Sequence, residues 1–299
     1  MAGTVAGIAA VPAASVSLIH AATGPSVPVS AVSGESPGEN AKRAVEALGG
    51  MGAFVSRGDV VVVKPNIGWD RTPEQAANTH PDFVVAVAAM CLAAGAKTVR
   101  VFDRTCNESR RCYVSSGIQE AVERFAKKNH ASDALLVYHV EGRKFVRTSI
   151  PEALALKEWE LYRDVLEADK VVNVPIAKHH SLSGVTLGLK NMMGVMGGNR
   201  GQVHFRLPEC LVDINRRIPS RLTVVDAGRV LLRNGPSGGN LDDVKGFGMA
   251  FASADVVAAD VTAAERIFGL KAESVPHLRL ALESGLGVSS PAQVRILKG

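Results

Sequence analysis

Short apolar runs alternate with longer amphipathic segments along most of the chain. Four consecutive valines at positions 60–63 are typical of a parallel strand that is buried on both faces. Further on, residues 81–94 place Phe83, Val87 and Cys91 on one face of a helix. Repeated alternation of this kind predicts an α/β fold, with a mostly parallel sheet flanked by helices.

The same patterns predict the other elements of the fold. Strands are expected at residues 60–63, 99–102, 134–140, 170–174, 222–225 and 248–252. Helices are expected at residues 41–48, 81–94, 118–128, 152–167, 189–196, 209–217, 253–268 and 275–286. Serine, proline and glycine recur in residues 26–40, which therefore read as a linker or loop.

The length of 299 residues is enough for one large domain or two ordinary ones. We expect residues 1–40 to form an apolar, Pro- and Ser-rich lead-in and residues 41–299 to form the α/β domain. Two arrangements of that domain are open. It is either one unit or two α/β lobes, at about 41–165 and 166–299, with a cleft between them.

The first 34 residues contain no Asp, Glu, Lys or Arg. Residues 5–19 resemble the apolar part of a secretory signal, but a basic segment before them is missing. Two interpretations follow: a lead-in to a cytoplasmic protein, or the truncated export signal of a periplasmic one. The segment is too short and too often interrupted by Gly and Pro for a membrane helix, so no stable membrane span is expected.

Composition narrows the classes of partner. Hydrophobic residues make up 46% and charged residues 21%, as in ordinary globular proteins. The net charge of +5 is dispersed, aromatic residues are only 5%, and we find no nucleic-acid motif, so nucleic acid is not an expected partner. A locally cationic pocket for a small anion explains the excess of positive charge better. The oligomeric state is not indicated.

Polar side chains follow the apolar strands at the point where each strand ends. In open α/β sheets, ligands bind outside the carboxyl ends of the strands. The candidates are Lys64 and Asn66, Asp103 and Arg104, Lys178, His179 and His180, and Lys190 and Asn191 in a glycine-punctuated segment. We predict that Lys64, Lys178 and Lys190 converge in one pocket, with Asn66, Arg104 and Asn191 as further substrate-binding groups.

The adjacent histidines cannot both face one pocket, because neighbouring side chains diverge from an extended segment. Under period-two alternation His180 lies on the same side as Lys178. We therefore predict that His180 faces the pocket as a general acid/base or metal ligand, and that His179 packs or caps. The catalytic candidates are His180, His179 and Lys178. A lone histidine is more often structural, and that alternative stays open for each of them.

Asp103, Asp226 and His80 are candidate metal ligands, since carboxylates and imidazoles bind divalent metals. Each also has a structural alternative. Asp103 could form an Asx-turn or pair with Lys64, and His80 could cap the helix that follows it. The cofactor is thus not determined, and a divalent metal or an iron–sulfur centre is compatible with the sequence.

Cys106 and Cys112 bracket a segment with two arginines, which favour the thiolate form of a nearby cysteine. Three interpretations compete: a disulfide in an exported protein, metal or redox cysteines, and ordinary buried thiols. The four cysteines contain no Cys-x-x-Cys pair. The sequence therefore encodes no zinc-ribbon or ferredoxin-type framework of its own.

Several ordered motifs resemble the domain-of-unknown-function 362 family. They are residues 64–70 with 78–81, residues 103–107 with 111–113, residues 173–180 with 190–194, and residues 225–226, 235–236, 253–255 and 259–260. The resemblance spans roughly residues 55–290 and implies no settled activity. Some members carry a ferredoxin-like cluster domain, which this chain lacks, and some have twin-arginine export signals. A looser similarity to nickel-cofactor lactate racemases is an analogy of fold.

Three functions are compatible with these residues. The first is an enzyme acting on a small carboxylate or phosphate, in which the lysines bind the anion and a histidine moves protons, with or without a metal. The second is a redox or metallocentre-binding accessory protein that uses Cys106 and Cys112. The third is a binding protein for a small ligand without catalysis.

Overall fold

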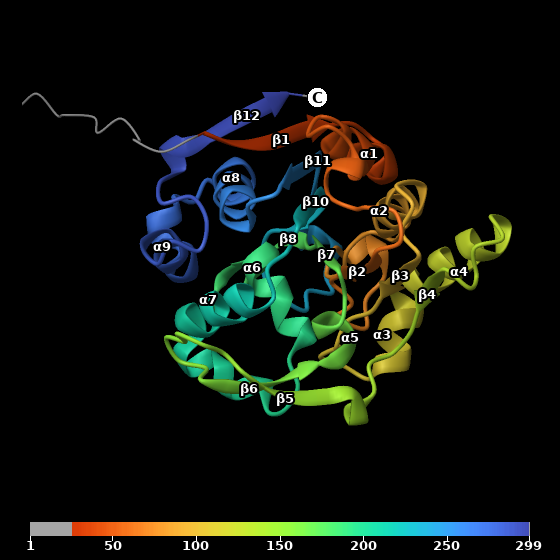
Figure 1. The fold of residues 1–299 in the computed structure, drawn as a ribbon. Helices are drawn as coiled ribbons and strands as arrows, with labels where there is room; N and C mark the ends of the chain where they lie inside the picture. The colour runs from red at the N-terminus through yellow and green to blue at the C-terminus, as the bar shows by residue number, and fades with distance from the viewer. Residues whose placement is uncertain (1–25, 299) are drawn as a thin grey trace, which may run out of the picture.

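The computed structural model describes residues 26–298, and a ten-stranded sheet forms the centre of the molecule (Figure 1). Its strands are β1 (Val27–Ser33), β2 (Val60–Pro65), β3 (Thr98–Val101), β4 (Leu135–Val137), β7 (Lys170–Val174), β8 (Ile176–His180), β9 (Gly184–Thr186), β10 (Leu222–Leu231), β11 (Val244–Ser253) and β12 (Val294–Lys298). The strand order is β12-β1-β11-β10-β7-β2-β3-β4, with β8 beside β10 and β9 beside β8.

The part of the sheet from β10 to β4 is parallel, which confirms the predicted fold class. β10 pairs in parallel with β7, β7 with β2, β2 with β3 and β3 with β4. β11 pairs antiparallel with both β1 and β10 and extends the sheet on the other side. The carboxyl ends of β2, β3 and β7 therefore open at one edge of the sheet, where ligands bind in such folds.

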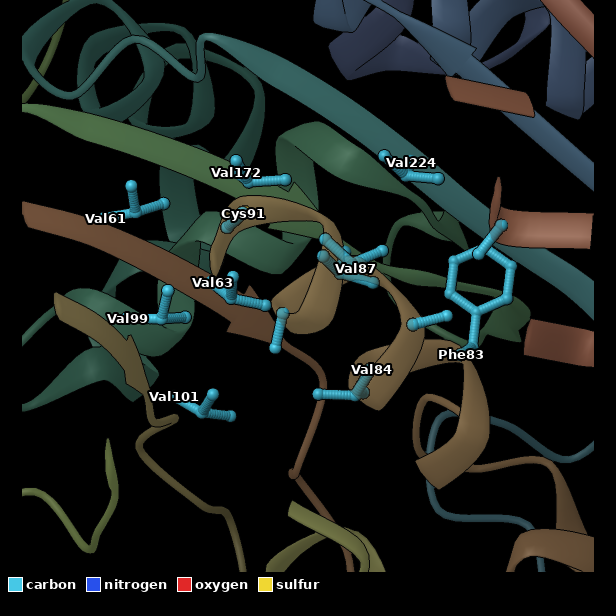
Figure 2. Close-up of a cluster of buried hydrophobic side chains, with 14 of the residues drawn as sticks. Val61, Val63, Phe83, Val84, Val87, Cys91, Val99, Val101, Val172 and Val224 are labelled. Carbon is cyan, nitrogen blue, oxygen red and sulfur yellow. The ribbon is translucent and has the colours of Figure 1, made fainter. Parts of the chain in front are cut away.

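Valines of β2 alternate between two hydrophobic cores. Val61 and Val63 pack on one face of the sheet, and Val62 packs on the other. The first face is covered by α1 (Pro37–Glu46), α2 (Pro81–Ala93) and α4 (Ile118–Lys128), and the second by α7 (Leu207–Arg217). Figure 2 shows the first core, where Phe83, Val87 and Cys91 of α2 pack with valines of the sheet; the sequence pattern predicts only that the three share one face of a helix. Burial on both faces explains the unbroken valine run.

A third core lies at the antiparallel end of the sheet. There α8 (Val256–Phe268) packs against β10 and β11, and α9 (Pro276–Glu283) packs against α7 and α8. β2 and β7, which come from the two lobes considered above, pair directly over Val61–Pro65 and Lys170–Val174. The sheet is thus continuous across the boundary near residue 165.

The prediction of a helix at residues 152–167 is wrong. The chain forms β5 (Phe145–Ser149) and β6 (Glu158–Tyr162), a separate antiparallel hairpin, and then the short helix α5 (Arg163–Leu166) (Figure 1). Polar and apolar residues alternate along β6 with a period of two, which suits a strand with one face packed. Asp213 of α7 holds the connection, because its carboxylate accepts hydrogen bonds from three consecutive backbone N–H groups, those of residues 154–156.

The prediction of a linker or loop at residues 26–40 is also wrong. β1 occupies much of it, and Ser36 caps α1 by accepting a hydrogen bond from the backbone N–H of Glu39. The apolar residues 5–19, read as a lead-in or truncated signal, lie outside the described residues. Between residues 26 and 298, no helix has the length and apolar character needed to cross a membrane.

Candidate functional site

Lys64 forms a fully buried ion pair at the carboxyl end of β2. Its ammonium lies 2.8 Å from the Oδ1 atom of Asp103, which follows β3. The ammonium also donates to the carbonyl oxygen of Pro65 at 2.6 Å, and Asp103 Oδ2 accepts from the backbone N–H of Ile67 at 2.7 Å. The charge of Lys64 is therefore neutralised by Asp103, which is the structural alternative considered for this pair. Lys64 thus lies beneath the candidate site and does not face it.

Three asparagines extend this pair into a hydrogen-bonded network. Asn191 accepts from the side chains of Lys64 and Asn66, and it donates to the Asn173 side chain and the Lys64 carbonyl. Asn173 donates in turn to the carbonyl oxygen of Gly188 at 2.9 Å. The network joins β2, β7 and the short helix α6 (Gly188–Asn191), which fixes the positions of the polar groups above it.

Gly194 has no room for a side chain. A Cβ atom there would lie 1.7 Å from Asp103 Oδ1 and 2.6 Å from Lys64 Nζ. The glycine thus allows the backbone after α6 to cover the ion pair. Its carbonyl oxygen also accepts from the backbone N–H of Arg104 at 3.0 Å.

A cavity of about 540 Å³ lies above this network. Its walls include Asn66, Trp69, Lys178, His180, Lys190 and Arg200. Strand β8 supplies Lys178 and His180, α6 supplies Lys190, and the glycine-rich segment after α6 supplies Arg200. Lys178 and Lys190 therefore share one cavity, while Lys64 lies buried below it.

Lys178 is 1% exposed, and its ammonium donates to the carbonyl oxygen of Ala77 and to Asn66 Oδ1. No acidic side chain between residues 26 and 298 forms an ion pair with it. Burial lowers the pKa of Lys178 to about 7, and the nearby charge of Lys190 acts in the same direction. At neutral pH this lysine therefore exchanges readily between its charged and neutral forms.

Lys190 is partly buried on the cavity wall. Within the described part of the chain, its ammonium has neither a hydrogen-bond acceptor nor an acidic partner. Burial lowers the pKa of Lys190 to about 8, with Arg200 and Lys64 as further cations. Asp260 of α8 fixes the position of α6, the helix that carries Lys190. Both carboxylate oxygens of Asp260 accept hydrogen bonds from backbone N–H groups at the start of α6. The first backbone N–H groups of α6 therefore already have hydrogen-bond acceptors within the protein.

His180 is buried on the cavity wall, and His179 is not part of that wall. Nδ1 of His180 accepts from the backbone N–H groups of Leu182 and Ser183, at 3.1 and 3.4 Å. Nδ1 of His179 accepts instead from the backbone N–H of Gly235 at 3.1 Å. Burial and the charges of Lys190 and Lys178 lower the pKa of His180 to about 3. His180 is therefore neutral at physiological pH, with its proton on Nε2.

Two arginines line the cavity and hold neighbouring loops together. Arg104 donates to the carbonyl oxygens of Met196 and Gly198, at 2.8 and 3.0 Å. Arg200 donates to the carbonyl oxygens of Arg104 and Thr105, at 2.8 and 2.7 Å. Both guanidinium groups therefore connect loops through backbone carbonyl oxygens while adding positive charge to the cavity wall.

The comparisons with known proteins identify a family. The model of the Domain of unknown function (DUF362) matches residues 61–265, most of the chain. The protein belongs to the DUF362 family. This confirms the resemblance seen in the ordered motifs, several of which supply the cavity.

One relative and two solved structures are similar to this DUF362 protein. Thylakoid-associated protein sll1697 of Synechocystis sp. is 28% identical over 256 residues, covering 83% of this chain and 74% of the relative. The lactate racemase apoprotein of Thermoanaerobacterium thermosaccharolyticum aligns with a TM-score of 0.44 and 12% identity, over 82% of this chain and 57% of that chain. A Thermotoga maritima protein aligns with a TM-score of 0.37 and 12% identity, over 69% and 54%. The chain thus spans little more than half of each solved structure.

The candidate metal ligands do not come together in this DUF362 protein. Asp103 pairs with Lys64, whereas Asp226 and His80 lie beside a separate hollow. Both oxygens of Asp226 accept backbone N–H groups, from His80 at 2.8 Å and Gly228 at 3.0 Å. The His80 side chain caps α2. Across residues 26–298, no cluster of three or more His, Cys, Asp or Glu side chains is arranged to hold a metal.

The two cysteines of the motif occupy different surroundings. Both are free thiols in the structure, so they form no disulfide there. Cys106 is exposed on the cavity wall, whereas Cys112 is buried in α3 (Ser109–Ser115) and lies 3.7 Å from the carbonyl oxygen of Gly68. Burial raises the pKa of Cys112 to about 11, which leaves it as an unreactive thiol.

The sequence did not single out Arg200, Thr186 or Trp69, which line the cavity. His204 also lines it, and its ring stacks on that of His180 with 6.1 Å between the centroids. The glycines around residues 197–201 were the available signal for this wall, since they mark the loop that carries Arg200.

Proposed function

We propose that this protein binds a small carboxylate or phosphate anion in the cavity and acts on it as an enzyme. The observation that supports this best is the presence of two lysines without acidic partners in one cavity. Lys190 would anchor the anion, and Lys178 would carry the proton.

Lys190 is suited to be the anchor because its ammonium faces the cavity with all of its hydrogen bonds to offer. Positive charge without a counter-ion costs free energy in a partly buried site. A bound anion would supply both the missing charge and the missing acceptors, and charge-assisted hydrogen bonds are the strong ones. The arginines that line the cavity would draw the anion toward this site.

Lys178 is a better proton carrier than the histidine expected from the sequence. General acid/base catalysis works best when the pKa of the group lies near the working pH. The pKa of Lys178 is lowered to about 7, whereas that of His180 is lowered to about 3. We therefore assign to His180 the role of a neutral hydrogen-bond donor through Nε2, and proton transfer to Lys178.

This assignment predicts that affinity for an anion falls as the pH rises. Sulfate is a suitable probe because its charge stays constant over this range. We expect it to bind tightest near pH 6, when both ammonium groups are protonated, and to weaken by about 10-fold or more by pH 9, since the pKa values of Lys178 and Lys190 are lowered to about 7 and 8. Isothermal titration calorimetry at a series of pH values would measure this.

The Lys178→Met variant separates the two lysines in that experiment. It should keep the weakening of affinity near pH 8, which belongs to Lys190, and lose the one near pH 7. An affinity that did not change between pH 6 and pH 9 would contradict the proposal.

A further inference from the structure

Cys106 is placed differently from the other three cysteines. It is exposed on the cavity wall, while Cys91, Cys112 and Cys210 are buried. Its backbone N–H donates to the carbonyl oxygen of Gly68 at 2.8 Å, and its sulfur lies 3.8 Å from a guanidinium nitrogen of Arg200. The thiol is therefore held in place and open to a ligand in the cavity.

Several cationic side chains lie around Cys106. Its sulfur lies within electrostatic range of Lys178, Lys190 and Arg104. Asp103 is the one carboxylate among the described residues of the cavity wall, and it is paired with Lys64. Reactive cysteines occur in electropositive, partly exposed surroundings of this kind.

The same cavity contains polar groups that lack partners. The hydroxyl of Thr186, a residue that is 3% exposed, has no hydrogen-bond partner and lies on the wall. The ammonium of Lys190 is likewise without an acceptor among residues 26–298. Unpartnered buried polar groups are rare in native structures. These groups line the same cavity as Cys106, and a ligand with several acceptor atoms would satisfy them.

We propose that Cys106 is a nucleophile and that the anion of this cavity carries an electrophilic carbon. This inference rests on the proposed function and names the chemical class of its substrate. The sulfur adds to a carbonyl carbon of the bound anion, so that the S–C bond forms as the C=O π bond opens. The thiol proton passes to the former carbonyl oxygen, and no further reactant is needed.

The test compares two alkylating reagents that differ in charge. Iodoacetate is an anion and iodoacetamide is neutral, and each forms an S–C bond with the thiolate as iodide leaves. We expect the ratio of the iodoacetate rate to the iodoacetamide rate at Cys106 to exceed that for 2-mercaptoethanol by about 10-fold or more, because a cationic cavity concentrates anions. Peptide mass spectrometry of the full chain would locate the modified cysteine.

Variants connect the rate ratio to the cavity. Lys190→Met should lower the ratio toward that of 2-mercaptoethanol, whereas Lys127→Met, on the exposed surface of α4, should leave it unchanged. Cys106→Ser should abolish the fast alkylation. A ratio equal to that of 2-mercaptoethanol, or fast alkylation at another cysteine, would overturn the proposal. If sulfate still bound with the expected pH dependence, only the nucleophile would be refuted and the anion site would stand.

Discussion

Replacing Lys190 with methionine is expected to weaken sulfate binding by about 10- to 100-fold at pH 6. The reason is the loss of a charge-assisted hydrogen bond, for which about 1.5–3 kcal/mol is typical. The same variant should not lower the free energy of unfolding, because the ammonium has no partner between residues 26 and 298 that would be left unpaired. Calorimetric titration with sulfate and urea unfolding without it would measure the two effects.

Lys127→Met is the matched control for this experiment. It removes the same charge from an exposed position on α4 that does not line the cavity. Net charge changes equally in the two variants, so a difference between them reports the position of the lysine. Equal sulfate affinity in the two variants would rule out Lys190 as the anchor.

Replacing Asp103 with alanine is expected to lower the free energy of unfolding by about 3–5 kcal/mol, the usual cost of breaking a buried ion pair. Lys64 is 0% exposed and would lose its carboxylate partner, and the backbone N–H of Ile67 would lose its acceptor. Burial already lowers the pKa of Lys64, whereas Asp103 opposes that shift. Urea unfolding monitored by circular dichroism would measure the loss.

Two further variants separate the ion pair from a general effect of mutation. The double variant Lys64→Met with Asp103→Leu should recover much of the lost stability, because neither charge is then left alone. Glu120→Ala, which breaks an exposed pair with Arg124 on α4, should change stability by no more than about 1 kcal/mol. A loss for Asp103→Ala as small as that of Glu120→Ala would show that the buried pair contributes little.

Much of the parallel sheet could be predicted from the sequence, because its strands are buried on both faces. The valines at residues 60–63 and those at residues 171, 172 and 174 carry that signal directly. β8 was missed because its inward side chains, Lys178 and His180, line a cavity and not an apolar core. A search for apolar runs cannot detect a strand whose inward side chains are polar because they line a cavity.

The position of the candidate cavity follows in outline from the sequence, since side chains that follow neighbouring parallel strands must meet at one edge. The sequence could not show which lysines face the cavity and which one is held in a buried ion pair. Lys64 follows a strand as its pattern suggested, yet a carboxylate from β3 neutralises it. Lys178 and Lys190 face the cavity, and that difference depends on side-chain directions fixed by tertiary packing. Their roles as proton carrier and anchor stay predictions.

The most direct test of the anion site is anomalous diffraction from crystals of the protein soaked in selenate, a sulfate analogue with a strong anomalous signal. We predict that the strongest peak lies in the cavity, within hydrogen-bond distance of Lys190 Nζ, and that Lys190→Met crystals lose it. Selenate bound only at surface arginines and lysines, with no peak in the cavity of the unmodified protein, would contradict the proposed anion site.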